Sequence, residues 1–125
     1  MNTMLKMIID DGVVTGLRQL FDEDQEGQAF LNALIQVFKD TGAESLAALR
    51  AAQARRALAE LARHAHKMKG LSRNIGAARL GDVCHELEMG AVTIGQPGVD
   101  QLCAAVDREF TDSCEELTRA YLRPA

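Results

Sequence analysis

The chain has 125 residues, of which 47% are apolar and 4% aromatic, and its formal net charge is −4. This length provides one hydrophobic core and excludes two comfortable domains, so we expect a single domain over residues 1–125. The acidic balance argues against a nucleic-acid-binding module, and no apolar run reaches the roughly 20 residues that span a bilayer.

The N-terminus predicts a soluble protein, and the cysteines predict neither a disulfide framework nor a metal site. The opening stretch MNTMLKMIIDDG reaches two acids before a signal-like apolar segment develops, so we expect a cytoplasmic protein. Cys84, Cys103 and Cys114 lie in helical patterns without a CxxC pair. Because this number and spacing suggest neither a disulfide framework nor a zinc ribbon, we expect small buried thiols and no bound metal.

The first half of the chain predicts a short helix and a long one. The short helix covers residues 11–21, where Leu20 and Phe21 end an apolar stripe at helical spacing. The acids of DEDQE then favour a new helix start. Apolar residues recur at three- and four-residue steps over residues 25–53, which predicts one long amphipathic helix. Gly42 weakens its middle by roughly 1 kcal/mol relative to Ala.

The second half predicts three further helices. One covers residues 56–75 and ends at Gly76, because glycine takes the left-handed conformation that closes a helix. The next covers residues 77–94, with Ile94 as its last inward residue, and the breaker GQPG follows it. The last covers residues 99–122.

The composition and the connections together predict the fold class. Ala and Leu dominate the sequence and favour helices over strands. Four long amphipathic helices with short connections predict an all-α fold. We expect an antiparallel up-and-down four-helix bundle with a short additional N-terminal helix.

The charges are unevenly distributed along the chain. The segment from Arg55 to Arg79 contains seven cations and one acid, Glu60, so its formal charge is +6 while the rest of the chain carries −10. A basic face on an acidic protein favours an acidic protein partner or a phosphate group as its ligand.

The third predicted helix carries two histidines that point in different directions. Each residue advances about 100° around a helix axis, so His64 and His66 diverge by about 160°. His64 falls on the apolar side with Met68, where a histidine is usually a core or boundary residue with hydrogen-bonded nitrogens. His66 falls on the solvent-facing side, among small or cationic neighbours that include Lys69 and Gly70.

The surroundings of His66 suit a phosphorylation site. A neutral imidazole nitrogen is a competent nucleophile near neutral pH, and Lys69 favours an anionic group such as a phosphoryl. Gly70 costs helix stability, but it leaves room for another protein to approach the ring. On these grounds alone, a solvated basic face without a function stays open as the alternative.

The residues from His66 onward resemble the signature of histidine-containing phosphotransfer (HPt) domains, the relay modules of multistep two-component phosphorelays. The signature covers about a fifth of the chain, and the predicted helix order is similar to that of the family over nearly all of it. The matching residues are His66, Lys69, Gly70, Ser72, Asn74, Gly76, Ala77, Leu80, Cys84, Leu87 and Glu88.

The resemblance implies a role for each matching residue of the site. His66 would be the phosphoacceptor, through Nε2, and Lys69 would support the phosphoryl charge. Gly70 would give clearance to a docking receiver domain. Glu88 would accept a hydrogen bond from Nδ1–H and so leave Nε2 free, although a solvated carboxylate on the helix flank is the alternative.

Three positions depart from the family pattern. Leu71 stands where a small residue is usual and points toward the core by the angle count. Arg73 replaces a small residue and adds a cation to the His66 face. His64 stands where an apolar or small residue is usual. With Arg63, Lys67 and Gly70, Arg73 forms the docking surface that we expect for an acidic receiver domain.

The resemblance implies a phosphoryl carrier. A phosphoryl group would move from an aspartyl-phosphate on one receiver domain to His66 and then to a second receiver. The chain has no P-loop and no GxGxxG motif, so we expect no ATP site and no kinase activity. The partners would be receiver domains and hybrid sensor kinases, no cofactor would be bound, and the receiver would supply Mg²⁺. We expect a monomer.

Three other functions are alternatives to a phosphoryl carrier. A docking bundle of the same fold would bind receivers or kinases without being phosphorylated. A metal site would draw on His64, His66, His85 or Cys84, but the divergence of the first two histidines disfavours it. A hydrolase using His66 as a base lacks an obvious nucleophile or second carboxylate. We assign no role to His85, which we expect to be exposed.

Overall fold

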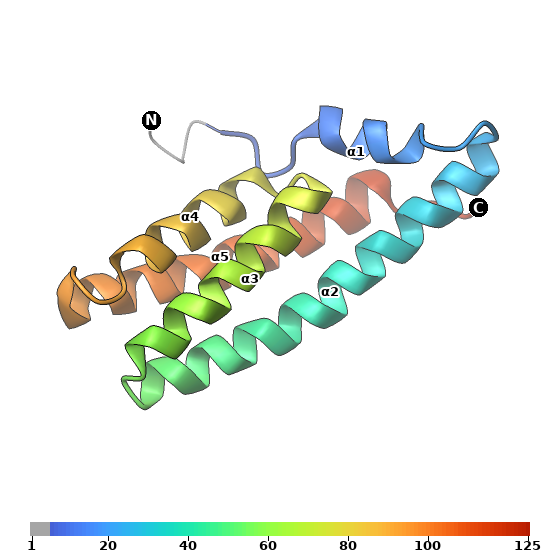
Figure 1. Ribbon diagram of the computed structural model, residues 1–125. Coiled ribbons are helices and arrows are strands. Elements are labelled where there is room, and N and C mark those ends of the chain that lie inside the picture. Colours follow the sequence, from blue (N-terminus) through green and yellow to red (C-terminus); the bar gives the residue numbers. More distant parts are fainter. Residues whose placement is uncertain (1–5) are drawn as a thin grey trace.

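The structure, a computed structural model, describes residues 6–125. The prediction that the N-terminus starts no signal segment falls largely on residues 1–5, outside this range. The described part contains five helices and no strand (Figure 1), which confirms the all-helical prediction. The helices are α1 (Asp11–Arg18), α2 (Asp24–Ala54), α3 (Leu58–Ile75), α4 (Ala78–Gly90) and α5 (Gly95–Tyr121).

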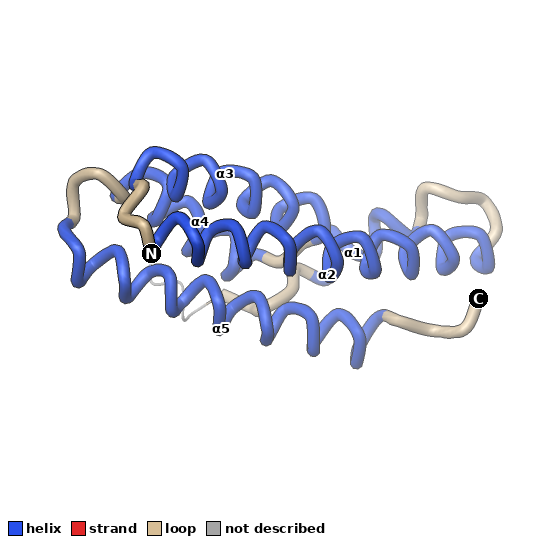
Figure 2. The backbone as a smooth tube through the Cα atoms, turned by 90° about the horizontal axis from the view of Figure 1, so that it is seen from below, coloured by secondary structure: helices blue, strands red, loops and turns tan. Residues whose placement is uncertain are grey.

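The four longer helices pack side by side around a common core. Helices α2 and α4 each contact both α3 and α5, and α1 lies across one end of the group (Figures 1 and 2). Helices α2 and α5 run antiparallel, because Gln28 donates to the carbonyl of Tyr121 while Gln53 donates to Asp100, each at 2.9 Å. Fully buried Leu, Ile, Val and Met side chains fill the space between the helices.

Gly42 has a packing role that the sequence analysis missed. A Cβ atom at this position of α2 would lie 2.3 Å from Cε1 of Phe110 on α5. The Phe110 ring instead fills that space and stacks obliquely on Phe38, with ring centroids 5.4 Å apart. The loss of helix propensity at Gly42 is therefore offset by the close approach of α2 and α5.

The turn between α3 and α4 depends on Gly76. This residue has a φ of 82°, in the left-handed region, which confirms the predicted helix end. Its carbonyl oxygen accepts a hydrogen bond of 2.7 Å from the amide of Asp10, so the turn also anchors the segment before α1. A Cβ atom here would approach the Asp10 carbonyl oxygen to 3.0 Å.

We expect Gly76→Ala to lower the free energy of unfolding by roughly 1–2 kcal/mol, because an L side chain is strained in the left-handed region. Gly16→Ala is the matched control. Among the described residues, no atom lies within 4 Å of a Cβ at Gly16, inside α1, so this variant should be slightly more stable than the wild type. Urea unfolding measures both, and a neutral effect at Gly76 would contradict the assigned role of the turn.

Two helices end earlier than predicted. Helix α1 stops at Arg18, and Leu20 and Phe21 lie outside it with exposed fractions of 68% and 40%. Helix α4 stops at Gly90 rather than at Ile94. Ile94 lies in the connection between α4 and α5. It is 43% exposed, and its side chain covers the space beside Gly90.

Two predicted boundaries around the turns are also wrong. The GQPG breaker forms the first turn of α5, where proline is tolerated because the first helical amides have no intrahelical partner. Arg56, predicted to be helical, has a φ of 56° between α2 and α3. Its guanidinium holds this left-handed conformation through two hydrogen bonds to Asp100, of 2.9 and 3.2 Å.

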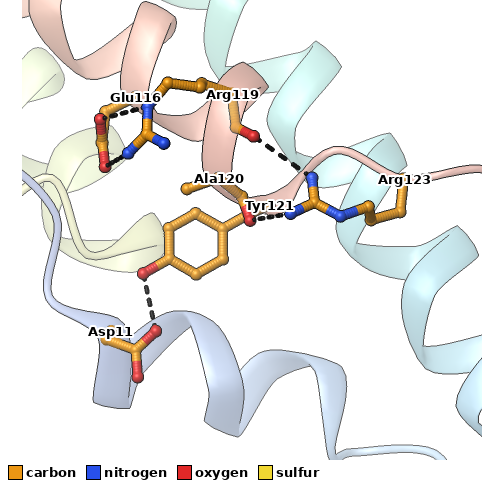
Figure 3. A network of polar contacts seen from close by, with 6 residues as sticks. All are labelled: Asp11, Glu116, Arg119, Ala120, Tyr121 and Arg123. Carbon is orange, nitrogen blue, oxygen red and sulfur yellow. Dashed lines mark hydrogen bonds and ion pairs between the residues drawn. The ribbon is translucent and has the colours of Figure 1, made fainter.

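At the C-terminal end of α5, Tyr121 hydrogen-bonds to α1 and the side chain of Arg123 caps the helix (Figure 3). The Tyr121 hydroxyl donates to Asp11 at 2.7 Å, and burial together with this carboxylate raises the pKa of Tyr121 to about 12. The Arg123 guanidinium donates to the carbonyls of Arg119 and Ala120, which otherwise lack helical partners.

No helix within residues 6–125 has the length and apolar character needed to cross a membrane.

Candidate functional site

His66 projects from the outer face of α3. Its side chain is 67% exposed, and Nδ1 lies 2.7 Å from Oε2 of Glu88 on the antiparallel neighbour α4. A carboxylate only accepts hydrogen bonds, so Nδ1 carries the hydrogen and Nε2 carries the free lone pair. Nε2 makes no polar contact with any residue in the described part of the chain.

Glu88 joins His66 to Lys69. Its second oxygen, Oε1, accepts a hydrogen bond of 2.6 Å from Lys69 Nζ. The side chains of Lys69 and Glu88 are only 15% and 21% exposed, so their charges are less screened than that of a free surface pair. Hydrogen bonds from Lys69 and then from His66 lower the pKa of Glu88, which is therefore ionised at neutral pH. Glu88 is therefore placed between the two side chains rather than on a solvated flank of the helix.

The predicted docking residues share the exposed face of α3. Arg63, Lys67, Gly70 and Arg73 are all exposed, and the three cations form no ion pair within residues 6–125. No atom of residues 6–125 lies within 4 Å of a Cβ atom built at Gly70, so these residues leave the space beside the imidazole open.

The basic segment from Arg55 to Arg79 offers fewer free cations than its sequence suggests. Four of the seven cations of the segment are paired with acids: Arg55 with Glu60, Arg56 with Asp100, Lys69 with Glu88, and Arg79 with Glu109. Arg79 is turned inward toward a buried carboxylate, so it does not belong to the exposed face. The charge available to a partner comes from Arg63, Lys67 and Arg73, which form no ion pair with any residue that the structure describes.

In the described part of the chain, the other histidines and Cys84 make no hydrogen bond to His66, Lys69 or Glu88. His64 is half-buried, as expected of a boundary residue, but its ring has no hydrogen-bond partner among the described residues, contrary to the prediction. His85 is exposed, as predicted. Cys84 is buried, and burial raises its thiol pKa to about 12. Within the described range, no group of three or more potential ligands could hold a metal ion.

The structure also shows an apolar groove that the sequence analysis missed. Its volume is about 360 Å³. Leu71, expected in the core, is only partly buried and lines this groove with the 53% exposed Val37. The direction of a residue on one helix does not reveal this groove, because the groove forms where α1, α2 and α3 meet. Its lining residues are Leu17, Phe30, Leu34, Val37, Phe38, Leu71, Asn74 and Ile75.

An all-helical fold that presents an exposed, carboxylate-bound histidine beside a lysine defines a candidate phosphotransfer domain. The Hpt domain family model matches residues 33–119, and the chain belongs to this family. Among solved structures, the chain is similar to histidine-containing phosphotransfer protein B (HptB) from Pseudomonas aeruginosa PAO1. The TM-score is 0.78 at 27% identity, over 90% of this chain and 92% of HptB. No curated protein matches the chain.

Proposed function

We propose that this protein is an up-and-down four-helix phosphotransfer domain that accepts a phosphoryl group on Nε2 of His66. The donor is an aspartyl-phosphate on one receiver domain, and the group passes to an aspartate on another receiver in a two-component phosphorelay. The observation that carries the proposal is the exposed Nε2 of a ring whose Nδ1 is held 2.7 Å from Glu88.

The chemistry requires little of this chain beyond position and charge. The lone pair of Nε2 forms a P–N bond while the P–O bond to the receiver aspartate breaks. Lys69 gives one hydrogen bond to Glu88 and has two further N–H donors for the phosphoryl oxygens. The receiver supplies Mg²⁺, and the protein acts as a carrier without an ATP site of its own.

The docking surface combines charge and apolar contact. Arg63, Lys67 and Arg73 attract an acidic receiver, and Gly70 lets it reach the imidazole. The apolar groove shares α3 with His66, since Leu71 and Asn74 follow Gly70 along the helix. We therefore place a receiver across both, with charge steering the encounter and the groove adding buried apolar area.

A two-step transfer assay tests the proposal. A phosphorylated receiver is mixed with the purified protein, the receiver is removed, and a second receiver is added. The relay function predicts that label moves to the protein and then to the second receiver. The alternative, a docking bundle, predicts that the receiver binds but keeps its label, and that result would remove the proposal.

Lys69→Met should slow acceptance from a receiver at least about tenfold at saturating receiver, because a charge beside the transferring group is lost. Lys67→Met is the matched control, since Lys67 is exposed and has no ion pair within the described residues. It should lower only the association rate, by an amount that disappears at high salt. Equal effects of the two variants would show that position 69 contributes bulk charge alone.

A further inference from the structure

Glu88 is placed to act on the phosphorylated ring as well as on the free one. Its two oxygens are both engaged, Oε2 with Nδ1 of His66 at 2.7 Å and Oε1 with Nζ of Lys69 at 2.6 Å. We propose that Glu88 shortens the lifetime of phosphohistidine at His66 by holding the Nδ1 proton on the phosphorylated ring. The inference rests on the proposed function and concerns how long the same site stays loaded.

The proton on Nδ1 decides how easily the phosphoryl group leaves. When the Nε2 lone pair forms the P–N bond, the ring keeps its Nδ1–H and becomes a cation. When a receiver carboxylate or water attacks phosphorus, the P–N bond breaks and its electron pair returns to Nε2, which leaves a neutral imidazole. If Nδ1 had lost its proton, the leaving group would be an imidazolate anion, and the bond would break far more slowly.

A carboxylate favours the cationic ring more than a neutral amide would. An ionised acceptor stabilises a cation through charge as well as through the hydrogen bond. Glu88 is ionised at neutral pH, since hydrogen bonds from Lys69 and His66 lower its pKa. Glu88 therefore acts as a positioning residue that keeps the phosphorylated ring in its labile form to higher pH than a glutamine would.

The other charged groups near Glu88 and His66 either oppose the effect of Glu88 on the ring or are screened. Lys69 draws the carboxylate charge toward itself and so weakens the effect of Glu88 on the ring. Arg63, Lys67 and Arg73 on α3 and His85 on α4 are exposed, and salt screens their charges. Within residues 6–125, neither α2 nor α5 makes a polar contact with Glu88 or His66, and the buried thiol of Cys84 is neutral.

The test is the decay of phosphohistidine across pH in three variants. The proteins are labelled with a small phosphoramidate, and loss of the P–N signal is followed by ³¹P NMR in 0.15 M salt, about the physiological ionic strength. In Glu88→Gln, the fall of the decay rate with rising pH should begin about one pH unit lower than in the wild type. At neutral pH its phosphohistidine should then live up to about tenfold longer.

Two further variants make the outcome decisive. Glu86→Gln, an exposed carboxylate on the same helix, should decay like the wild type. Lys69→Met should move the decay profile in the opposite direction from Glu88→Gln, because it frees the Glu88 charge. A Glu88→Gln profile equal to that of the wild type, in a protein that labels normally, would overturn this inference alone. A wild type that takes no label would instead overturn the proposed function.

Discussion

Gly70→Leu should leave a well-folded protein that no longer accepts a phosphoryl group from a receiver domain at a useful rate. In the described part of the chain, no atom lies within 4 Å of a Cβ at this exposed position of α3, so the fold has room for the side chain. Leu is a better helix former than Gly, so the melting temperature should stay the same or rise. The leucine would fill the approach to Nε2, and a displacement of about 1 Å costs about a hundredfold in transfer rate.

The size of the donor separates this effect from damage to the site. A small phosphoramidate does not need the open space over Gly70, so it should label Gly70→Leu nearly as well as the wild type. Gly70→Ala should give an intermediate receiver-dependent rate. Unchanged transfer from a receiver to Gly70→Leu would show that the partner approaches His66 from another side.

Arg79→Met should be the most destabilising single substitution considered, with a loss of about 3–5 kcal/mol in the free energy of unfolding. Arg79 Nη2 donates to Oε1 of Glu109 at 2.7 Å, and Glu109 is almost completely buried on α5. Removal of the guanidinium leaves a buried carboxylate without its counter-ion, and a charge in that position costs far more than a lost surface pair.

The double variant Arg79→Met with Glu109→Leu should recover most of that loss. In the described part of the chain, Nε of Arg79 and Oε2 of Glu109 have no hydrogen-bond partner, so the pair is only partly satisfied. Replacement of an imperfect buried pair by apolar side chains is often neutral or stabilising. Chemical denaturation of the four proteins of the cycle measures the coupling, and a double variant as unstable as Arg79→Met would contradict this explanation.

The sequence predicted the elements whose causes are local. The spacing of apolar residues predicted the positions of the long helices. The ability of glycine to adopt the left-handed conformation predicted the end of α3 at Gly76. The angle between successive residues also placed His64 and His66 on different sides, as the 67% exposure of His66 bears out. These features depend on a single helix, so one sequence window contains the information that determines them.

The features that the sequence analysis missed all depend on contacts between helices. Nothing near Gly42 in the sequence indicates that Phe110 fills the space above it. The inward turn of Arg79 depends in the same way on Glu109, which lies 30 residues away. The second bond of Glu88, to Lys69, and the groove beside Leu71 likewise require the positions of neighbouring helices.

The most direct test of the account is the intact mass of the wild type and of His66→Gln after exposure to a phosphorylated receiver or a small phosphoramidate. The samples are kept at neutral or basic pH because phosphohistidine is acid-labile, and His64→Gln and His85→Gln serve as matched controls. We expect one added phosphoryl group in the wild type and in both controls, and none in a folded His66→Gln. If His66→Gln still gains a phosphoryl group, the phosphorylated residue is not His66. If the wild type gains none, the result favours a protein that docks without being phosphorylated.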